Sequence, residues 1–217
     1  RLCASLFASP FGLSVSIYMS EVANPKVRNW LKPIIELLSG IPSVVYGFFG
    51  LIVIVPLIQK LFNLPVGESG LAGSIVLAIM ALPTIITVTE DAMRNCPRAM
   101  REASLALGAS QWQTIYKVVI PYSISGITSG VVLGIGRANG ETMAVLLMPD
   151  NAAVIPTTIL APLRTIPATI AAELGEAPAG GPHYQALFLL GVVLFFITLI
   201  INFSVEYISS KGLKRSK

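Results

Sequence analysis

The sequence is poor in charged residues. Only 12% of its 217 residues are Asp, Glu, Lys or Arg, against about a quarter in ordinary soluble domains. By contrast, 54% are hydrophobic and the mean hydropathy is +0.76. The apolar residues come in long blocks, whereas soluble helices and strands carry them as periodic stripes. The composition therefore argues against a soluble domain and predicts an all-α, polytopic membrane helix bundle.

Chemically active residues are also scarce. The two cysteines, Cys3 and Cys96, have neither zinc-site spacing nor a position that predicts a disulfide. The single histidine, His183, lies in a loop without evident Ser or Asp partners, so no hydrolytic triad or metal site is predicted. The ATP-binding pattern GxxxxGK[ST] does not occur, and "GIGRANG" lacks the spacing of a dinucleotide-binding loop. We expect no catalytic residue, metal or cofactor in this chain, which is predicted not to be an enzyme.

Five apolar blocks are long enough to cross a membrane, which takes roughly 17–25 helical residues for about 30 Å of hydrocarbon. Prolines interrupt the first three blocks, which is typical of kinked helices whose neighbours satisfy the freed carbonyl groups. We predict spans at residues 2–20, 34–59, 71–89, 121–148 and 184–208.

Basic residues are concentrated in alternate connections. Residues 21–33, residues 90–120 and the C-terminal tail together hold eleven Lys and Arg residues, whereas the loops 60–70 and 149–183 hold two. The positive-inside rule places the three basic regions in the cytoplasm. The same rule explains the net charge of +4 without invoking nucleic acid, so no nucleic-acid binding is expected.

This orientation puts the N-terminus outside. A further helix before Arg1 would account for it and would make six in a parent protein. We therefore expect residues 1–217 to form one transmembrane domain that lacks its first helix. Residues 90–120 are then a cytoplasmic loop and residues 149–183 an extracytoplasmic loop.

The loop 90–120 has the pattern of two short helices. Asn95 or Cys96 is the expected cap of the first helix, with Pro97 in its first turn. Helix-favouring residues continue through Leu107. Gly108 then suits the left-handed position that ends a helix.

Ser110 suits the N-cap of the second helix, residues 111–119, and Pro121 is expected in the first turn of the fourth membrane helix. The result is a helix–Gly–helix elbow, which fits either a groove on a partner protein or the membrane surface itself. Its apolar residues are Met100, Leu105, Leu107, Trp112 and Tyr116.

The elbow also carries a family resemblance. Residues 102–121, "EASLALGASQWQTIYKVVIP", resemble the EAA motif of ABC importer permeases: Glu-Ala-Ala, three residues, Gly, nine residues, then Ile-x-Leu-Pro. Ser104 replaces the second Ala, and Val118 and Ile120 replace Ile and Leu. The resemblance implies a coupling helix that docks on an ATP-binding subunit. The residues it implies for coupling are Glu102, Ala103, Gly108, Trp112 and Pro121.

The stretch "GIGRANGETMAV", residues 134–145, places Arg137 and Glu141 four residues apart inside the fourth predicted span. If the helix starts near Pro121, Arg137 lies about 24 Å along it, where an arginine costs at least about 2.5–3.5 kcal/mol. Such a residue faces a cavity or a partner and is a functional candidate. Its guanidinium group can donate two parallel hydrogen bonds to an oxyanion, and Glu141, one helical turn on, can hold it in place.

Small and hydroxylated residues surround this pair. Three glycines, at 134, 136 and 140, leave space beside Arg137 for an anion or another helix. Thr142 and Ser129 could add hydroxyl donors. The residues leave two interpretations open: an oxyanion site in a pathway, or a structural ion pair with glycines that only pack helices. A latch that the anion must break would combine both.

"GRANGETMAV" resembles the fourth-helix signature of phosphate-specific ABC importer permeases, Gly-Arg-Ala-x-Gly-Glu-Thr. Its continuation, with "IPSVVYGFFGL" at 41–51 and "GGPHYQALFLLGVVLF" at 180–195, resembles the PstC-type subunit. Asn139 departs from the pattern, because an apolar residue is expected there. The resemblance covers essentially the whole chain and implies the fold of a type I ABC importer permease. The pathway or gate residues it implies are Arg137, Glu141, Thr142, Ser129 and Gly140.

The resemblance implies a permease subunit of an ATP-driven phosphate importer in the prokaryotic plasma (inner) membrane. Implied partners are a PstA-type second permease, two PstB-type subunits that bind ATP and Mg, and a PstS-type extracytoplasmic phosphate-binding protein. The loop 149–183, with Arg164, could face that binding protein. The alternatives are a permease for sulfate or molybdate, which fits the EAA motif equally, a secondary transporter or channel, which would need no elbow, and a structural scaffold.

Overall fold

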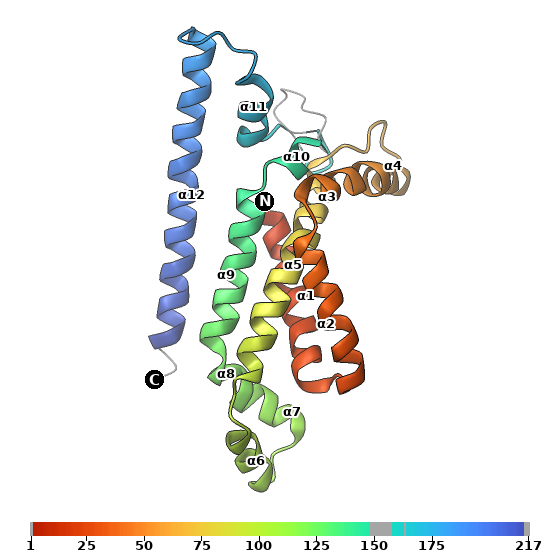
Figure 1. Ribbon diagram of the computed structural model, residues 1–217, viewed down its shortest axis with the longest axis vertical. Helices are drawn as coiled ribbons and strands as arrows, with labels where there is room; N and C mark the ends of the chain where they lie inside the picture. The colour runs from red at the N-terminus through yellow and green to blue at the C-terminus, as the bar shows by residue number, and fades with distance from the viewer. Residues whose placement is uncertain (1, 148–157, 163, 215–217) are drawn as a thin grey trace. The chain divides into compact units, whose positions relative to one another are not determined.

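The computed structural model describes residues 2–147, 158–162 and 164–214, which form helices, turns and loops without a strand, as an all-α chain should. Figure 1 labels the α-helices; three short π-helical turns, η1 to η3, join some of them. In order, the elements are α1 Leu2–Ile17, η1 Tyr18–Val22, α2 Pro25–Gly40, α3 Ser43–Phe49, η2 Gly50–Ile54, α4 Val55–Phe62, α5 Gly70–Arg94, α6 Arg98–Ala106, α7 Gln111–Thr114, η3 Ile115–Val119, α8 Ile120–Tyr122, α9 Ile124–Gly140, α10 Met143–Leu147, α11 Ile166–Glu173 and α12 Pro182–Lys214.

Within the described residues, four helical stretches are long and apolar enough to cross a membrane. A fifth arises if the stretch Gln111–Tyr122 and α9, which meet at a bend of 71°, are counted as one span. Five spans agree with the number expected from the sequence. The four unbroken stretches are Cys3–Val22, Ser43–Phe62, Gly70–Arg94 and Pro182–Ile201.

The expected limits of two spans are wrong. The second was placed at 34–59, but α2 ends at Gly40 and a new helix begins at Ser43. Pro42 causes the break: its backbone is extended (φ −59°, ψ 140°), and a proline disfavours helical geometry at the residue before it. The fourth span, expected at 121–148, is interrupted at Ser123 and ends at Gly140; its last expected residue, 148, lies outside the described residues.

Contacts divide the chain into two compact units, each with its own core. The first unit comprises Arg1–Ala4, Ile41–Met80 and Arg137–Asn202, and the second comprises Ser5–Gly40, Ala81–Gly136 and Phe203–Lys217. One core cluster of the first unit consists of Tyr46, Val76, Met80 and Ala144. The core cluster of the second unit consists of Met93, Cys96, Val119 and Ile127, with Leu13, Ile17 and Ile120 packed against it.

In the second unit, α9 packs closely on α5 through glycines spaced four residues apart. A Cβ atom added at these glycines would come within 2.2–2.7 Å of a side chain of α5, so only glycine fits. Glycines with this spacing let the backbones of membrane helices approach each other. The facing pairs are Gly126 with Ala92, Gly130 with Thr89, and Gly134 with Ile85.

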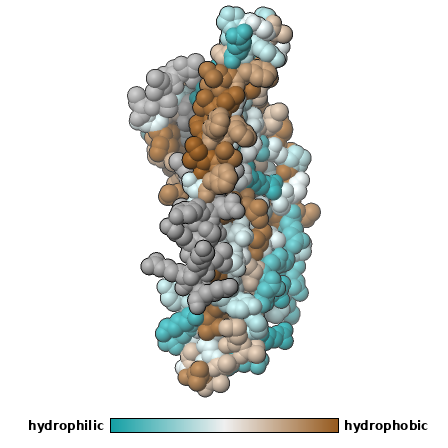
Figure 2. All heavy atoms as spheres, turned by 90° about the vertical axis from the view of Figure 1, so that its left-hand side faces the viewer, coloured by the Kyte–Doolittle hydropathy of each residue, from teal (hydrophilic) through white to brown (hydrophobic). Residues whose placement is uncertain are grey.

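The helix α12 exposes apolar side chains along its first half. Only 6% of its membrane-length window, Pro182–Ile201, is buried, and Figure 2 shows the hydrophobic side chains of this part gathered on one face. Apolar side chains can remain uncovered in this way when lipid or another membrane protein surrounds them. The exposed residues include Phe188, Leu189, Phe195, Phe196, Ile200 and Phe203.

Candidate functional site

Arg137 lies in the last turn of α9, which ends three residues later at Gly140. A cation at this position interacts favourably with the partial negative charge of a helix C-terminus. Arg137 is half-buried, while Gly136 and Gly140 on either side of it are exposed. A Cβ atom added at either glycine would meet no described atom within 4 Å. The expected space beside Arg137 is therefore present at these two glycines.

Gly134 differs from the other two glycines of the motif. The side chain of Ile85 in α5 occupies the place where its Cβ atom would lie, at 2.3 Å. Of the two occupants expected beside these glycines, an anion or another helix, Gly134 has the helix, because it packs on α5. Gly134 and Gly136 are two residues apart, and successive residues of a helix are rotated by about 100° about its axis. The two glycines therefore lie on different faces of α9, one packed and one open.

Glu141 does not continue the helix of Arg137. It follows the helix end, and its Oε1 atom accepts hydrogen bonds from the backbone N–H groups of Met143 (3.0 Å) and Ala144 (3.3 Å). The carboxylate thus caps the N-terminus of α10, where a negative charge is favourable. The premise that Arg137 and Glu141 are one turn apart on a single helix is wrong, because α9 stops at Gly140.

The two hydroxyl residues of the predicted site have different surroundings. Thr142, between α9 and α10, borders a hollow that is also lined by Pro167 and Ala171 of α11 and by Tyr184 of α12. Ser129 lies eight residues before Arg137 in α9, and its hydroxyl donates to the carbonyl oxygen of Ser125 (2.9 Å). Thr142 is therefore placed beside an open space, whereas the proton of Ser129 is used within its own helix.

The elbow forms largely as its sequence predicts. α6 ends at Ala106, and Gly108, just after its C-cap residue Leu107, lies in the left-handed region (φ +83°). Ser110 caps α7 in a reciprocal capping box, in which its Oγ atom accepts from Gln113 N and the Gln113 side chain accepts from Ser110 N. The hydroxyl groups of Ser104 and Thr114 lie 2.9 Å apart and join the two arms.

Two prolines of the elbow take other positions than expected. Pro97 is itself the N-cap residue of α6, so neither Asn95 nor Cys96 caps that helix. Pro121 lies in the short α8, and the membrane helix α9 begins only at Ile124, after the bend at Ser123. The buried Ser123 donates its hydroxyl to the carbonyl oxygen of Ala92 (3.0 Å), which ties this bend to α5.

The outer surface of the elbow carries large apolar side chains among polar ones. Leu107, at the tip, is 90% exposed and Tyr116 is 74% exposed. Trp112, Glu102 and Ala103 are exposed as well. Large exposed apolar side chains that gather on a short turn are typical of a surface that another protein covers. The elbow can therefore serve as a docking element.

Glu173, at the end of α11, contacts two basic residues. Arg164 Nη1 lies 2.5 Å from Glu173 Oε1, and His183 Nε2 lies 3.1 Å from Glu173 Oε2. These contacts join the segment before α11 to the end of α11 and the start of α12. Arg164 is thus paired within the chain, and its predicted contact with a binding protein stays a prediction.

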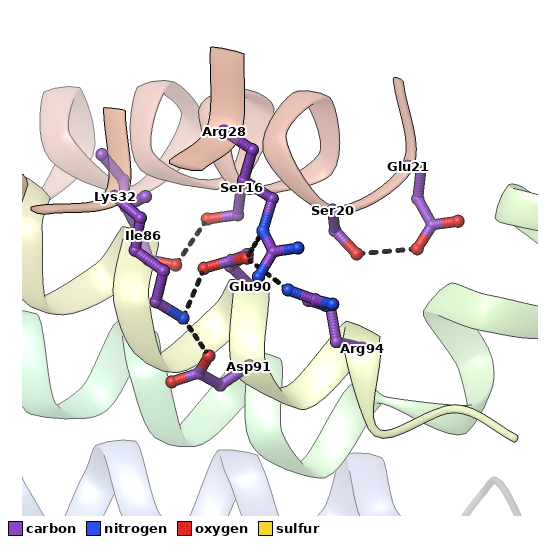
Figure 3. A network of polar contacts seen from close by, with 9 residues as sticks. All are labelled: Ser16, Ser20, Glu21, Arg28, Lys32, Ile86, Glu90, Asp91 and Arg94. Carbon is purple, nitrogen blue, oxygen red and sulfur yellow. Dashed lines mark hydrogen bonds and ion pairs between the residues drawn. The ribbon is translucent and has the colours of Figure 1, made fainter. Parts of the chain in front are cut away.

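A second charge cluster was not predicted from the sequence. The carboxylate of Glu90, near the end of α5, is 1% exposed. Arg28 and Lys32 of α2 reach it at 2.7 Å and 3.0 Å, and Arg94 of α5 reaches it at 3.7 Å (Figure 3). From the sequence, these cations are explained by membrane orientation alone. The four-residue spacings of Arg28 with Lys32 and of Glu90 with Arg94 were the available signals.

Comparisons with known proteins agree on one family. The profile described as "binding-protein-dependent transport system inner membrane component" matches residues 10–212. A probable ABC transporter permease protein of Bacillus subtilis, YqgH, is 40% identical over 210 residues, which is 97% of this chain and 68% of the relative. The phosphate transport system permease protein PstC of Mesorhizobium japonicum is 37% identical over 223 residues, with 94% and 68% covered.

Solved structures show the same fold. An inward-facing form of the MetNI methionine ABC transporter matches with a TM-score of 0.72 and 18% identity, over 96% of this chain and 89% of that chain. A bacterial ABC transporter that imports alginate matches with a TM-score of 0.69 and 18% identity, over 97% and 76%. At these identities the likeness concerns the fold, which is that of ABC importer permeases.

Proposed function

The chain belongs to the family of binding-protein-dependent transport system inner membrane components, and we propose that it is a permease subunit of an ATP-driven importer of inorganic phosphate. It forms half of the translocation pathway, and a second, related permease forms the other half. Arg137 carries the proposal: it is a cation at the end of an apolar helix, beside two glycines whose faces are open. The similarity to PstC proteins supports phosphate as the cargo.

The chemistry of Arg137 suits an oxyanion such as phosphate. Its planar guanidinium group donates two parallel hydrogen bonds and keeps its charge at every physiological pH. Thr142 adds a hydroxyl beside the neighbouring hollow. Glu141, which caps α10, carries a negative charge four residues after Arg137. Such a charge limits the attraction for an anion, and a pathway must bind its cargo weakly enough to release it.

The energy comes from partner subunits. ATP-binding subunits dock on the elbow, whose exposed apolar residues support this role. An extracytoplasmic binding protein delivers phosphate to the side of α11. The chain is a multi-pass protein of the inner membrane, with the elbow and the C-terminal tail in the cytoplasm, where the positive-inside rule puts the basic connections. ATP and Mg bind to the partner subunits.

The test is ATP-dependent uptake of radiolabelled phosphate. The complete complex, with both permeases, the ATP-binding subunits and the binding protein, is reconstituted in vesicles with either Arg137 or Arg137→Gln. Loss of a hydrogen bond to a charged group costs about 1.5–3 kcal/mol, so Arg137→Gln should lower uptake by about tenfold or more. Thr128→Val, a change in the same helix outside the predicted pathway residues, should leave uptake nearly unchanged because the Thr128 hydroxyl donates only within the helix, to the carbonyl oxygens of Ile124 and Ser125.

Competition identifies the cargo. Unlabelled phosphate should abolish the signal, while sulfate and molybdate should not. Preferential transport of sulfate or molybdate would assign the chain to another oxyanion importer. Normal uptake by an assembled Arg137→Gln complex would show that the arginine only stabilises the fold. Uptake that continues without ATP-binding subunits would point to a secondary transporter or channel.

A further inference from the structure

The helix α2 makes several charged contacts with α5 in its unit. No side chain of α2 is fully buried, and its partly buried apolar residues include Leu31, Ile34 and Ile35. Its polar contacts are specific, because Arg28 and Lys32 both reach the buried carboxylate of Glu90. Lys32 also donates to Asp91 at 2.6 Å. Figure 3 shows these cations converging on one turn of α5.

Residues 90–93 of α5, here called the anchor turn, also hold the elbow. Arg101 of α6 donates to the carbonyl oxygen of Met93 at 2.8 Å. The same guanidinium group pairs with Glu21, whose side chain is 6% exposed at the end of the first span. Ser123, at the start of the bend into α9, donates to the carbonyl oxygen of Ala92. One turn of α5 thus contacts α2, α6 and the α8–α9 junction within a single unit.

Stability alone does not account for the charges around Glu90. Buried ion pairs can usually be replaced by apolar residues of similar volume with little loss of stability. An ion pair differs from an apolar contact because its two charged groups must keep a specific distance and orientation. It therefore holds two helices in a defined register. The charges around Glu90 therefore suit a mechanical link between helices that have to move together.

Building on the proposed function, we infer that Glu90 is a positioning residue through which movement of the elbow reaches α2. When the ATP-binding subunits move the elbow, Arg101 carries the movement to the anchor turn, and Glu90 carries it to α2 through Arg28 and Lys32. α2 leads directly, through Ile41 and Pro42, into the span Ser43–Phe62. Without Glu90, ATP hydrolysis proceeds but the second span does not follow.

The experiment measures transport and ATP hydrolysis in the same vesicles. The complete complex is prepared with Glu90→Gln, which keeps the shape of the side chain and removes its charge. ATP hydrolysis should stay within about twofold of the unaltered complex. The phosphate imported per ATP hydrolysed should fall by about tenfold, a magnitude within the range of known coupling between sites.

Three further variants separate positioning from general stability. Glu90→Asp keeps the charge and should restore most of the coupling. Asp91→Asn removes one contact of Lys32 through a side chain that is 54% exposed and leaves the three cations on Glu90, so it should lower the ratio much less than Glu90→Gln. Arg28→Gln leaves Glu90 with two cations, Lys32 and Arg94, so this complex should assemble even if Glu90→Gln does not. It should also import less phosphate per ATP hydrolysed than the unaltered complex. An unchanged ratio in assembled Arg28→Gln and Glu90→Gln complexes, or a parallel loss of hydrolysis and uptake, overturns the inference.

Hydrogen exchange tests the role of Glu90 without depending on which anion the complex transports. Addition of ATP should change the exchange of backbone amides in both α6 and α2 of the unaltered complex. In the Glu90→Gln complex the change should persist in α6 and disappear in α2. If the unaltered complex imports no phosphate, the proposed function fails, whereas the exchange measurement still tests the role of Glu90. An ATP-induced change in α2 that survives in Glu90→Gln overturns it.

Discussion

Replacing Gly126 by alanine should loosen the packing of α9 on α5, whereas the same replacement at Gly136 should not. An added Cβ atom at Gly126 would lie 2.2 Å from the Cβ atom of Ala92, although carbon atoms in contact prefer about 3.5–4.0 Å. Ala92 has no rotatable side chain that could move aside, so the two helices must separate. At Gly136, no described atom lies within 4 Å of the added carbon.

The magnitude follows from two opposing effects. Overpacking a well-packed site costs about 1–3 kcal/mol, while glycine to alanine in a helix gains up to about 1 kcal/mol. Gly126→Ala should therefore be destabilised by up to about 2 kcal/mol, and Gly136→Ala should be neutral or stabilised by up to about 1 kcal/mol. The helix-propensity gain is common to both variants, so the difference between them, about 1–3 kcal/mol, measures the steric effect alone.

Denaturant titration of the purified chain in detergent micelles, followed by tryptophan fluorescence, gives this difference. Equal midpoints for Gly126→Ala and Gly136→Ala would refute the reasoning, because the shared gain in helix propensity would then be the only effect. A lower midpoint for Gly136→Ala than for Gly126→Ala would show that the open face of α9 is covered in solution.

Two other predictions concern the charged contacts of α2 and the elbow. Burial, the largest influence on Lys32, lowers its pKa, but hydrogen bonds and charges from Asp91 and Glu90 outweigh it and raise the pKa above 10.5. The stabilisation of the fold by protonated Lys32 is therefore complete below pH 10.5 and is lost as the pH rises through the higher pKa of the folded state. Denaturant titrations between pH 9 and 12 should show a fall in the free energy of unfolding, and this fall should be smaller in Lys32→Met. Leu107→Asp should change stability by no more than about 0.5 kcal/mol because the side chain is 90% exposed, yet it should strongly reduce co-purification with the ATP-binding subunit; unchanged co-purification would contradict docking through Leu107.

Local signals in the sequence predicted the elbow well. Gly108 takes the left-handed conformation and Ser110 forms a capping box, because both depend on residues within a few positions along the chain. The positions of the prolines were less predictable. A proline favours several places near a helix start, so the sequence could not distinguish Pro97 as the cap residue from Pro97 inside the first turn.

The site around Arg137 was predicted in part. The open faces of Gly136 and Gly140 agree with the sequence pattern. Arg137 itself lies in the last turn of α9, whereas the sequence placed it inside a span that continues to residue 148. The four-residue spacing to Glu141 was misleading, because a spacing describes a shared face only while the helix continues. The helix ends at Gly140, and the carboxylate of Glu141 caps the next helix instead.

The sequence by itself determined that this chain is a helical membrane protein with five apolar segments and an elbow, because hydrophobic length, proline, glycine and capping residues act locally. Only the tertiary structure decided which glycines pack and which stay open, since that depends on side chains of α5 that are about forty residues away. It also decided that Glu90 gathers cations from α2, 58 and 62 positions away. A buried charge selects its partners by distance in space, and no local pattern in the sequence records that distance.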